Sequence, residues 1–212
     1  MKFLNCDKIL CLSAHPDDVE YGVLGSMIKF KDTDFFVMVL SRGGDFDNTT
    51  SMGRVSENEN IWDKIDNVSG TFLSSSISNS KYVRDYKEDE LVMEIEKYDN
   101  KMKFDCVLVP PPKDSHFEHR MVHNLAPALA RKKKLGMVVY KTPSTLDTWI
   151  SNLMVDVTSQ FEEKVKLLKY FKSQQNQSYF GLDSISTFHS DYQCTKRGIK
   201  YVELYRVEKI YE

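Results

Sequence analysis

Four short apolar runs constrain the fold of this chain most strongly. Each is apolar without interruption, so it lacks the alternation of polar and apolar residues that marks a strand with one face in water. Strands of this kind are typical of a sheet buried on both faces. The runs are residues 9–12, 35–40, 106–109 and 137–140.

Amphipathic stretches separate and follow these runs. They carry apolar residues at spacings of three and four, the repeat of a helix with one buried face, near residues 20–31, 54–67, 87–102, 118–133 and 158–172. Strands alternating with helices predict a mostly parallel sheet covered on both faces. We therefore expect an α/β fold, a Rossmann-like three-layer sandwich. No Pro-, Gly- or Ser-rich run could serve as a linker, so we expect a single domain over residues 1–212.

Charge and cysteine content limit the partners and the compartment. With 29 Lys and Arg against 31 Asp and Glu, the formal net charge is −2, which offers no broad basic field for nucleic acid. The four cysteines form no CxxC pair, and this favours a reduced protein of the cytoplasm. No apolar stretch approaches the about 20 residues that a membrane-spanning helix needs. The sequence leaves the oligomeric state open, a homo-oligomer included.

The first polar cluster follows the run at residues 9–12. Ligands of parallel sheets bind beyond the carboxyl ends of the strands, and residues 13–18 read Ser-Ala-His-Pro-Asp-Asp there. The segment lacks the GxGxxG pattern that admits a pyrophosphate, so we expect no NAD or FAD. It places one imidazole and two carboxylates, His15, Asp17 and Asp18, at the predicted crevice.

A second cluster follows the run at residues 106–109, after three prolines that direct the chain out of the sheet. It contains Asp114, His116, Glu118 and His119. Facing each other across one pocket, the two clusters would supply the three His or carboxylate ligands of a catalytic zinc. They would also leave a carboxylate and a histidine for proton transfer.

Each of these residues also has a purely structural interpretation. Asp17 or Asp18 could cap the helix that follows, because Asp is a favoured N-cap residue. His119 and His123 are four apart, which is more typical of a partly exposed helix face, and the acid of an HExxH motif is not between them. His189 stands alone in a polar stretch, and we expect it at the surface.

The two clusters together resemble the motifs of the LmbE-like, or PIG-L, family of zinc-dependent N-deacetylases. Residues 14–18, with Glu20, Gly22 and Gly25, are similar to the first motif, and residues 114–120 are similar to the second. The resemblance continues through Ser41-Arg42-Gly43, the Arg54/Glu57 pair and a C-terminal pattern that includes residues 155–158, Lys164 and Glu203. Glu118 departs from the family pattern, in which Asp is usual.

The resemblance implies a role for each residue of the two clusters. His15, Asp18 and His119 would hold the zinc, although Fe²⁺ or another divalent ion suits the same ligands. Asp17 would be the general base for the attacking water. His116, kept protonated by nearby Asp114 or Glu118, would stabilise the oxyanion.

The implied reaction is hydrolysis of the acetamido group of an N-acetylated amino sugar to a free amine and acetate. Candidate substrate contacts are Arg42, Asp45 and Arg54. One alternative is a carbohydrate-binding protein without turnover, and the presence of Asp17 and His116 argues against it, because a binder needs neither a base nor an oxyanion donor. A second alternative is the same metal-dependent hydrolysis of an amide that is not a sugar.

Overall fold

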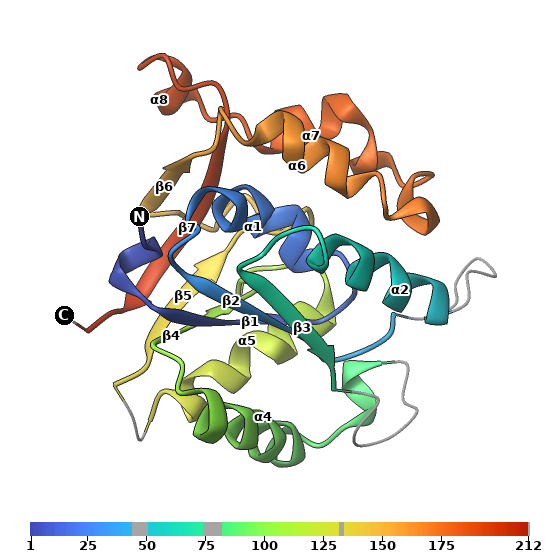
Figure 1. The fold of residues 1–212 in the computed structure, drawn as a ribbon, viewed down its shortest axis with the longest axis vertical. Coiled ribbons are helices and arrows are strands. Elements are labelled where there is room, and N and C mark those ends of the chain that lie inside the picture. The colour runs from blue at the N-terminus through green and yellow to red at the C-terminus, as the bar shows by residue number, and fades with distance from the viewer. Residues whose placement is uncertain (44–50, 74–81, 132–133, 212) are drawn as a thin grey trace.

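One seven-stranded sheet runs through the protein (Figure 1). The computed structural model describes residues 1–43, 51–73, 82–131 and 134–211. The strand order is β3-β2-β1-β4-β5-β7-β6, in which the first five strands are parallel, and β7 pairs antiparallel with β5 on one side and with β6 on the other. The strands are β1 (Lys8–Ser13), β2 (Asp34–Val39), β3 (Val68–Phe72), β4 (Cys106–Val109), β5 (Gly136–Tyr140), β6 (Leu153–Asp156) and β7 (Val202–Lys209).

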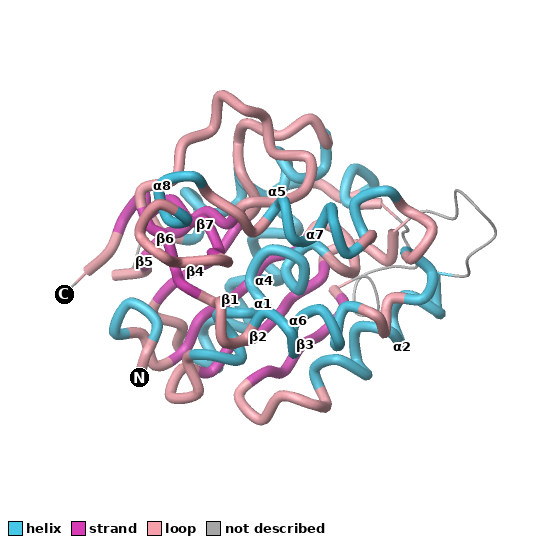
Figure 2. Tube along the Cα trace, turned by 90° about the horizontal axis from the view of Figure 1, so that it is seen from above, coloured by secondary structure: helices cyan, strands magenta, loops and turns pink. Residues whose placement is uncertain are grey.

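Both faces of the central strands are buried under helices. Along β1, Ile9 and Cys11 face one cluster of apolar side chains, and Leu10 and Leu12 face another on the opposite side. Helices α1 (Asp18–Lys29), α2 (Ser51–Trp62) and α6 (Phe161–Leu168) contribute to the first cluster, and α4 (Glu88–Met102) and α5 (Phe117–Leu129) to the second. Figure 2 looks from the side of α1 and α6, which lie over the strands together with the short helices α7 (Leu182–Phe188) and α8 (Tyr192–Thr195).

The predicted α/β fold with a mostly parallel sheet is confirmed, and each predicted run and amphipathic stretch corresponds to a strand or helix. The sequence analysis missed β3, β6 and β7. Strand β3 contains Ser69 and Gly70, β6 has only four residues, and β7 alternates charged with apolar residues at its exposed end. None of the three forms an uninterrupted apolar run, because all lie toward the edges of the sheet.

The topology brings the two polar clusters together. Strands β1 and β4 are neighbours, paired through Ile9 with Cys106 and Cys11 with Leu108. The chain leaves β1 toward α1 on one face and reaches α5 on the other face after β4. This divergence opens a crevice at the carboxyl ends of the two strands, the place where sheets of this type bind ligands.

Across the described segments, the helices are all too short or too polar to cross a membrane.

Candidate metal and active site

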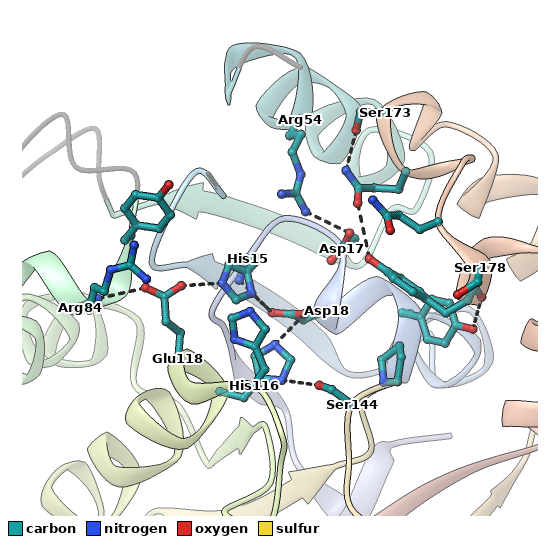
Figure 3. Close-up of a pocket in the computed structure, with 17 residues that line it drawn as sticks. His15, Asp17, Asp18, Arg54, Arg84, His116, Glu118, Ser144, Ser173 and Ser178 are labelled. Carbon is teal, nitrogen blue, oxygen red and sulfur yellow. Dashed lines mark hydrogen bonds and ion pairs between the residues drawn. The ribbon is translucent and has the colours of Figure 1, made fainter. Parts of the chain in front are cut away.

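A pocket of about 490 Å³ opens at the carboxyl ends of β1 and β4 (Figure 3). Its lining includes residues of both polar clusters: His15, Asp17 and Asp18 from the first, and His116, Glu118 and His119 from the second. Other lining residues come from α2, the turn η2 (Val83–Asp85), the loop after β5 and the segment between α6 and α7. The volume lies in the range of about 300–1,000 Å³ that is usual for small-molecule sites. The predicted convergence of the two clusters on one pocket is therefore observed.

Residues 15–18 turn sharply from β1 into α1. Asp17, the residue before the helix, adopts φ 108° and ψ −28°, a left-handed conformation that is costly for a residue with a Cβ. Its side chain makes no capping hydrogen bond to the helix, so the helix-cap interpretation fails for Asp17. The carboxylate lines the pocket instead.

Asp18 lies between two imidazoles. Its Oδ2 is 3.3 Å from His15 Nδ1 and accepts a hydrogen bond from the His15 backbone N–H at 2.8 Å. Its Oδ1 is 3.1 Å from His119 Nε2. The carboxylate of Asp18 thus faces one ring nitrogen of His15 and one of His119. Figure 3 shows the contact between His15 and Asp18.

The second nitrogen of each imidazole is also held by a carboxylate. His15 Nε2 is 2.7 Å from Glu118 Oε2, and His119 Nδ1 is 3.0 Å from Asp114 Oδ2. A histidine that ligates a metal through one nitrogen characteristically donates the other N–H to a carboxylate, which fixes its orientation. Glu118 in place of the usual Asp therefore orients His15.

These outer carboxylates are themselves fixed. Glu118 Oε1 accepts the backbone N–H of Arg84 at 3.2 Å. Asp114 accepts hydrogen bonds from Thr142 Oγ1 at 2.5 Å and Ser144 Oγ at 2.6 Å. The imidazoles are thereby held in place by the surrounding chain.

The donor set fits a divalent cation. His15, His116 and His119 offer ligand atoms that all lie within 4.8 Å of one another, and Asp18 touches two of the three rings. Nitrogen and carboxylate ligands in this number suit Zn²⁺ and related ions. His123 stands apart, with its Nδ1 against Pro110 O at 3.0 Å.

The charges around the site favour a cation. Although burial opposes it, contact with Asp18 and Asp114 raises the pKa of His119 to about 10, and Asp18 and Glu118 raise the pKa of His15. The two imidazoles in turn hold the pKa of Asp18 well below its usual range despite its burial. The carboxylates of Asp18, Asp114 and Glu118 thus favour positive charge on the imidazoles of His15 and His119. In the metal-free chain protons supply this charge, and the same carboxylates would attract a metal ion.

Asp17 has the environment of a general base. Burial raises its pKa to about 7, although the Arg54 guanidinium, with Nη2 at 3.1 Å from Asp17 Oδ2, acts in the opposite direction. Arg54 Nη2 also donates to Pro16 O at 2.9 Å. A carboxylate with a pKa near neutral pH accepts a proton efficiently and returns it later.

His116 precedes α5 and lies at the pocket surface, with its ring stacked on His119 at 4.7 Å. Burial and the charges of His15 and His119 lower its pKa to about 4. The expectation that Asp114 or Glu118 keeps His116 protonated is therefore wrong for the metal-free chain. Those carboxylates face His119 and His15 instead, and His116 is a neutral imidazole with one N–H to donate.

The three candidate substrate contacts have different outcomes. Arg54 lines the pocket but is paired with Asp17. Arg42 is partly buried and does not belong to the described lining of the pocket. Asp45 lies outside the described residues.

Sequence reasoning missed much of the pocket wall. Arg84 stacks its guanidinium on the Tyr82 ring, 4.0 Å from the centroid, beside Glu118. Ser173 lies in a turn, where Glu57 accepts its N–H at 2.9 Å and its hydroxyl at 2.6 Å, and it also lines the pocket. Tyr179 adds an aromatic side chain to the lining of the pocket.

The expectation that His189 lies at the surface is wrong. Its side chain is fully buried, with Nε2 2.7 Å from Lys164 Nζ and Nδ1 2.8 Å from Ile185 O. Lys164 is equally buried and pairs with Glu203 Oε1 at 2.5 Å. Glu203 also accepts the backbone N–H groups of α1 at Gly25 and Ser26, at 2.7 and 2.8 Å. This buried network therefore ties α1 to β7 and α6.

Solved structures share this fold. The N,N′-diacetylchitobiose deacetylase of Pyrococcus horikoshii matches with a TM-score of 0.72 and 20% identity over 97% of this chain and 85% of that chain. The 4-carboxy-2-hydroxymuconate hydratase of Pseudomonas putida matches with a TM-score of 0.76 and 15% identity over 100% and 99%. The deacetylase of the pseudoaglycone of the antimicrobial reagent A40926 matches with a TM-score of 0.74 and 13% identity over 97% of this chain and 99% of that chain.

The fold alone leaves the reaction open, because it occurs in a hydratase as well as in deacetylases. A comparison with curated protein sequences found no match. The family model described as PIG-L, GlcNAc-PI de-N-acetylase, matches residues 10–130, which include both polar clusters and more than half of the chain. The chain therefore belongs to the PIG-L family.

Proposed function

We propose that this protein is a metal-dependent N-deacetylase that hydrolyses the acetamido group of an N-acetylated amino sugar. The observation that carries the proposal is the arrangement around Asp18. Two imidazoles share this carboxylate, and each is backed by a further carboxylate, at the floor of a pocket that also holds Asp17. Membership of the PIG-L family supports it.

His15, Asp18 and His119 would hold the ion, with zinc as the first candidate and Fe²⁺ as another. When bound, such an ion lowers the pKa of water and polarises the acyl oxygen, which removes several kcal/mol from the barrier to amide hydrolysis. His116 offers a ligand atom to the same place. We assign it to the substrate side, because none of the carboxylates that fix His15 and His119 orients its ring.

Asp17 performs the proton transfers in the proposed reaction. It takes a proton from the water whose oxygen attacks the acyl carbon, and it gives that proton to the nitrogen as the C–N bond breaks. Arg54 holds the carboxylate of Asp17 in place. The neutral imidazole of His116 donates its N–H to the developing oxyanion, a contribution typically worth about 10²–10³ in rate.

A carbohydrate-binding protein without turnover fits this site less well. Binding does not require a strained, buried carboxylate such as Asp17, with a pKa near neutral, in one pocket with the imidazole of His116. An amide that is not a sugar remains the alternative substrate. Two structures with the same fold are described as deacetylases of a diacetylated disaccharide and of a pseudoaglycone, which favours N-acetylated sugar substrates.

Two further aspects follow from the sequence. The four cysteines are free and buried in the structure, which agrees with a reducing compartment, and we propose the cytoplasm. A small N-acetylated sugar or glycoconjugate is the proposed partner.

The test is release of a primary amine by purified protein loaded with Zn²⁺ or Fe²⁺. The panel contains N-acetylglucosamine, its glycosides and nucleotide conjugates, and N-acetylated amino acids as amides without a sugar. We expect amine and acetate in equal amounts from the sugars, and no activity for Asp17→Asn that still holds its metal. Turnover of the amino acids alone would contradict the sugar assignment, and no release from any member would contradict the proposed function.

A further inference from the structure

Buried polar atoms without a hydrogen-bond partner gather between helices α1 and α2. Of the five such side-chain atoms in the described part of the chain, four belong to three residues: Arg54 Nε, Glu20 Oε2 and both polar atoms of the Asn58 amide. We call these three residues the interface cluster. Burial of a polar atom without a partner is unfavourable, and folded proteins seldom leave one unsatisfied. Four in one place therefore indicate that something else binds there.

The α2 members of the interface cluster lie on one face of that helix. Arg54, Asn58 and Trp62 are spaced by four residues, so their side chains follow one another along the helix. Arg54 Nη2 is 3.1 Å from Asp17 Oδ2 at the start of α1 (Figure 3). Trp62 Nε1 donates to Glu20 Oε1 at 2.7 Å in the first turn of α1. Asn58 lies between these two contacts, and its side chain is fully buried.

Contacts at both ends of this face confine the side chains. The Arg54 guanidinium packs against the backbone of Gly43, where an added Cβ would overlap Nη1. The Trp62 ring packs against Gly70 of β3, where a Cβ would lie 2.6 Å from the ring. A change of rotamer at Arg54 or Trp62 would break these contacts. It therefore offers the interface cluster no way to satisfy its atoms.

The Asn58 amide lies close to Glu20 but is not bonded to it. Burial raises the pKa of Glu20, and the nearby Trp62 and Asn58 side chains act in the opposite direction. Trp62 does so through its hydrogen bond to Oε1, whereas neither polar atom of Asn58 forms a hydrogen bond. Polar groups that are near each other but too far apart for a direct hydrogen bond are commonly bridged by water.

The unpartnered atoms fit a water molecule better than an ion. Arg54 Nε and Asn58 Nδ2 are donors, and Asn58 Oδ1 and Glu20 Oε2 are acceptors. A buried water both donates and accepts, and it typically makes about three hydrogen bonds to groups that are otherwise unsatisfied. The Arg54 charge disfavours a cation, and the acceptor oxygens of Asn58 and Glu20 disfavour an anion.

We propose that internal water binds the interface cluster and joins Arg54 Nε to Asn58 and Glu20, and that Asn58 is thereby a positioning residue for the base Asp17. The water fixes the guanidinium through Nε, and the guanidinium fixes Asp17 through Nη2. Asn58 does not belong to the described lining of the catalytic pocket, so it acts through Arg54 and not on the substrate. The positioning role rests on the proposed function, whereas the water site does not.

High-resolution diffraction tests the water site. In wild-type crystals we expect an ordered water about 2.7–3.2 Å from Arg54 Nε and from an atom of Asn58 or Glu20. Asn58→Leu, which has a similar size but no polar atom, should lose this water. Asn60→Leu is the matched control, since Asn60 is exposed on the same helix, and it should keep the water. No water beside Arg54 Nε in wild-type crystals would overturn the site.

Kinetics on the best substrate of the panel above test the positioning role. We expect Asn58→Leu to lower kcat by about 10–100-fold, because a small displacement of a catalytic group has an effect of this size, with KM and Zn²⁺ affinity unchanged. Asn58→Ser keeps a donor and an acceptor and should recover most of kcat, and Asn60→Leu should match the wild type. Asn58→Ala replaces Asn58→Leu in every measurement if Asn58→Leu does not fold.

A double-mutant cycle with Arg54→Ala separates positioning from a general structural effect. If Asn58 acts through Arg54, Asn58→Leu lowers kcat in the wild type but not in Arg54→Ala. An equal factor in both backgrounds would overturn the positioning role.

The two parts of the proposal fail separately from the proposed function. Normal turnover by Asn58→Leu overturns the positioning role and leaves the function standing. No amine release by the wild type from any substrate overturns the function and the positioning role together, whereas diffraction alone decides the water site.

Discussion

The imidazole of His15 is held between two carboxylates, with Nε2 2.7 Å from Glu118 and Nδ1 3.3 Å from Asp18. Glu118 comes from α5 and Asp18 from α1, helices on opposite faces of the sheet. One histidine thus connects the two halves of the site. The longer side chain at position 118, where the family usually has Asp, is the one that reaches it.

Removal of the Glu118 carboxylate should weaken metal binding without removing a ligand. We expect Glu118→Ala to lower affinity for Zn²⁺ by about 10–100-fold, because His15 loses the partner that orients it. Glu118→Gln keeps an oxygen acceptor for His15 and should lose less. Competition with a chromophoric chelator measures the Zn²⁺ affinity of both variants and of the wild type. Equal affinities for wild type and Glu118→Ala would show that Glu118 does not orient a ligand.

The two ligand sets available in the site predict different behaviour of His116. In the first set Asp18 completes the ligands beside His15 and His119, and in the second set His116 does. If Asp18 is the third ligand, Asp18→Asn should lose the metal, while His116→Ala should retain about one equivalent of metal and show a kcat lower by a factor of about 10²–10³. The metal content of the two variants after dialysis distinguishes the two sets. Loss of metal from His116→Ala and retention by Asp18→Asn would assign the ligand role to His116.

Activity should rise with pH as Asp17 loses its proton. The pKa of about 7 belongs to the metal-free chain, and a bound dication lowers it, so we expect the acid limb of kcat/KM below pH 7. Arg54→Gln removes a cation that lowers the pKa of Asp17 and should move this limb to higher pH. An acid limb at the same pH in both proteins would mean that another group is the base.

Burial of His189 should make the fold less stable in mild acid. Burial and the Lys164 charge hold its pKa well below the ordinary value of 6.5. The unfolded chain therefore binds a proton below pH 6.5 that the folded chain excludes, and stability falls as pH falls. Between pH 7.5 and 5.5 this group should cost up to about 1.4 kcal/mol.

The matched variant for this prediction is His189→Gln, which cannot titrate. Urea unfolding of both proteins at the two pH values gives the difference that belongs to His189, since all other groups are common to both. A pH dependence that is the same in His189→Gln and wild type would contradict the prediction.

The sequence was most informative where function depends on neighbouring residues in the chain. Continuous apolar runs identified β1 and β4, and the polar residues directly after them predicted that two clusters, one with His15 and one with His119, converge on one pocket. The choice of His15, Asp18 and His119 as ligands came from the family resemblance. The remainder of the pocket comes from loops and turns such as those that carry Arg84 and Tyr179. Their placement depends on packing between distant segments, which no local pattern records.

The burial of His189 also depends on distant segments of the chain that no local sequence pattern records. A histidine among Ser, Thr, Phe and Asp residues reads as exposed, but Lys164 and Glu203 come from α6 and β7 to form a buried network with it. Burial of such a group is favourable only when its partners are present. A single sequence does not show which distant residues those partners are.

The measurement that most directly tests this account is anomalous diffraction from crystals of the protein loaded with Zn²⁺. The account predicts one ion within about 2.0–2.2 Å of His15 Nδ1, His119 Nε2 and an oxygen of Asp18. Absence of an ion between these three residues in metal-loaded crystals, or an ion held elsewhere in the chain, would contradict it.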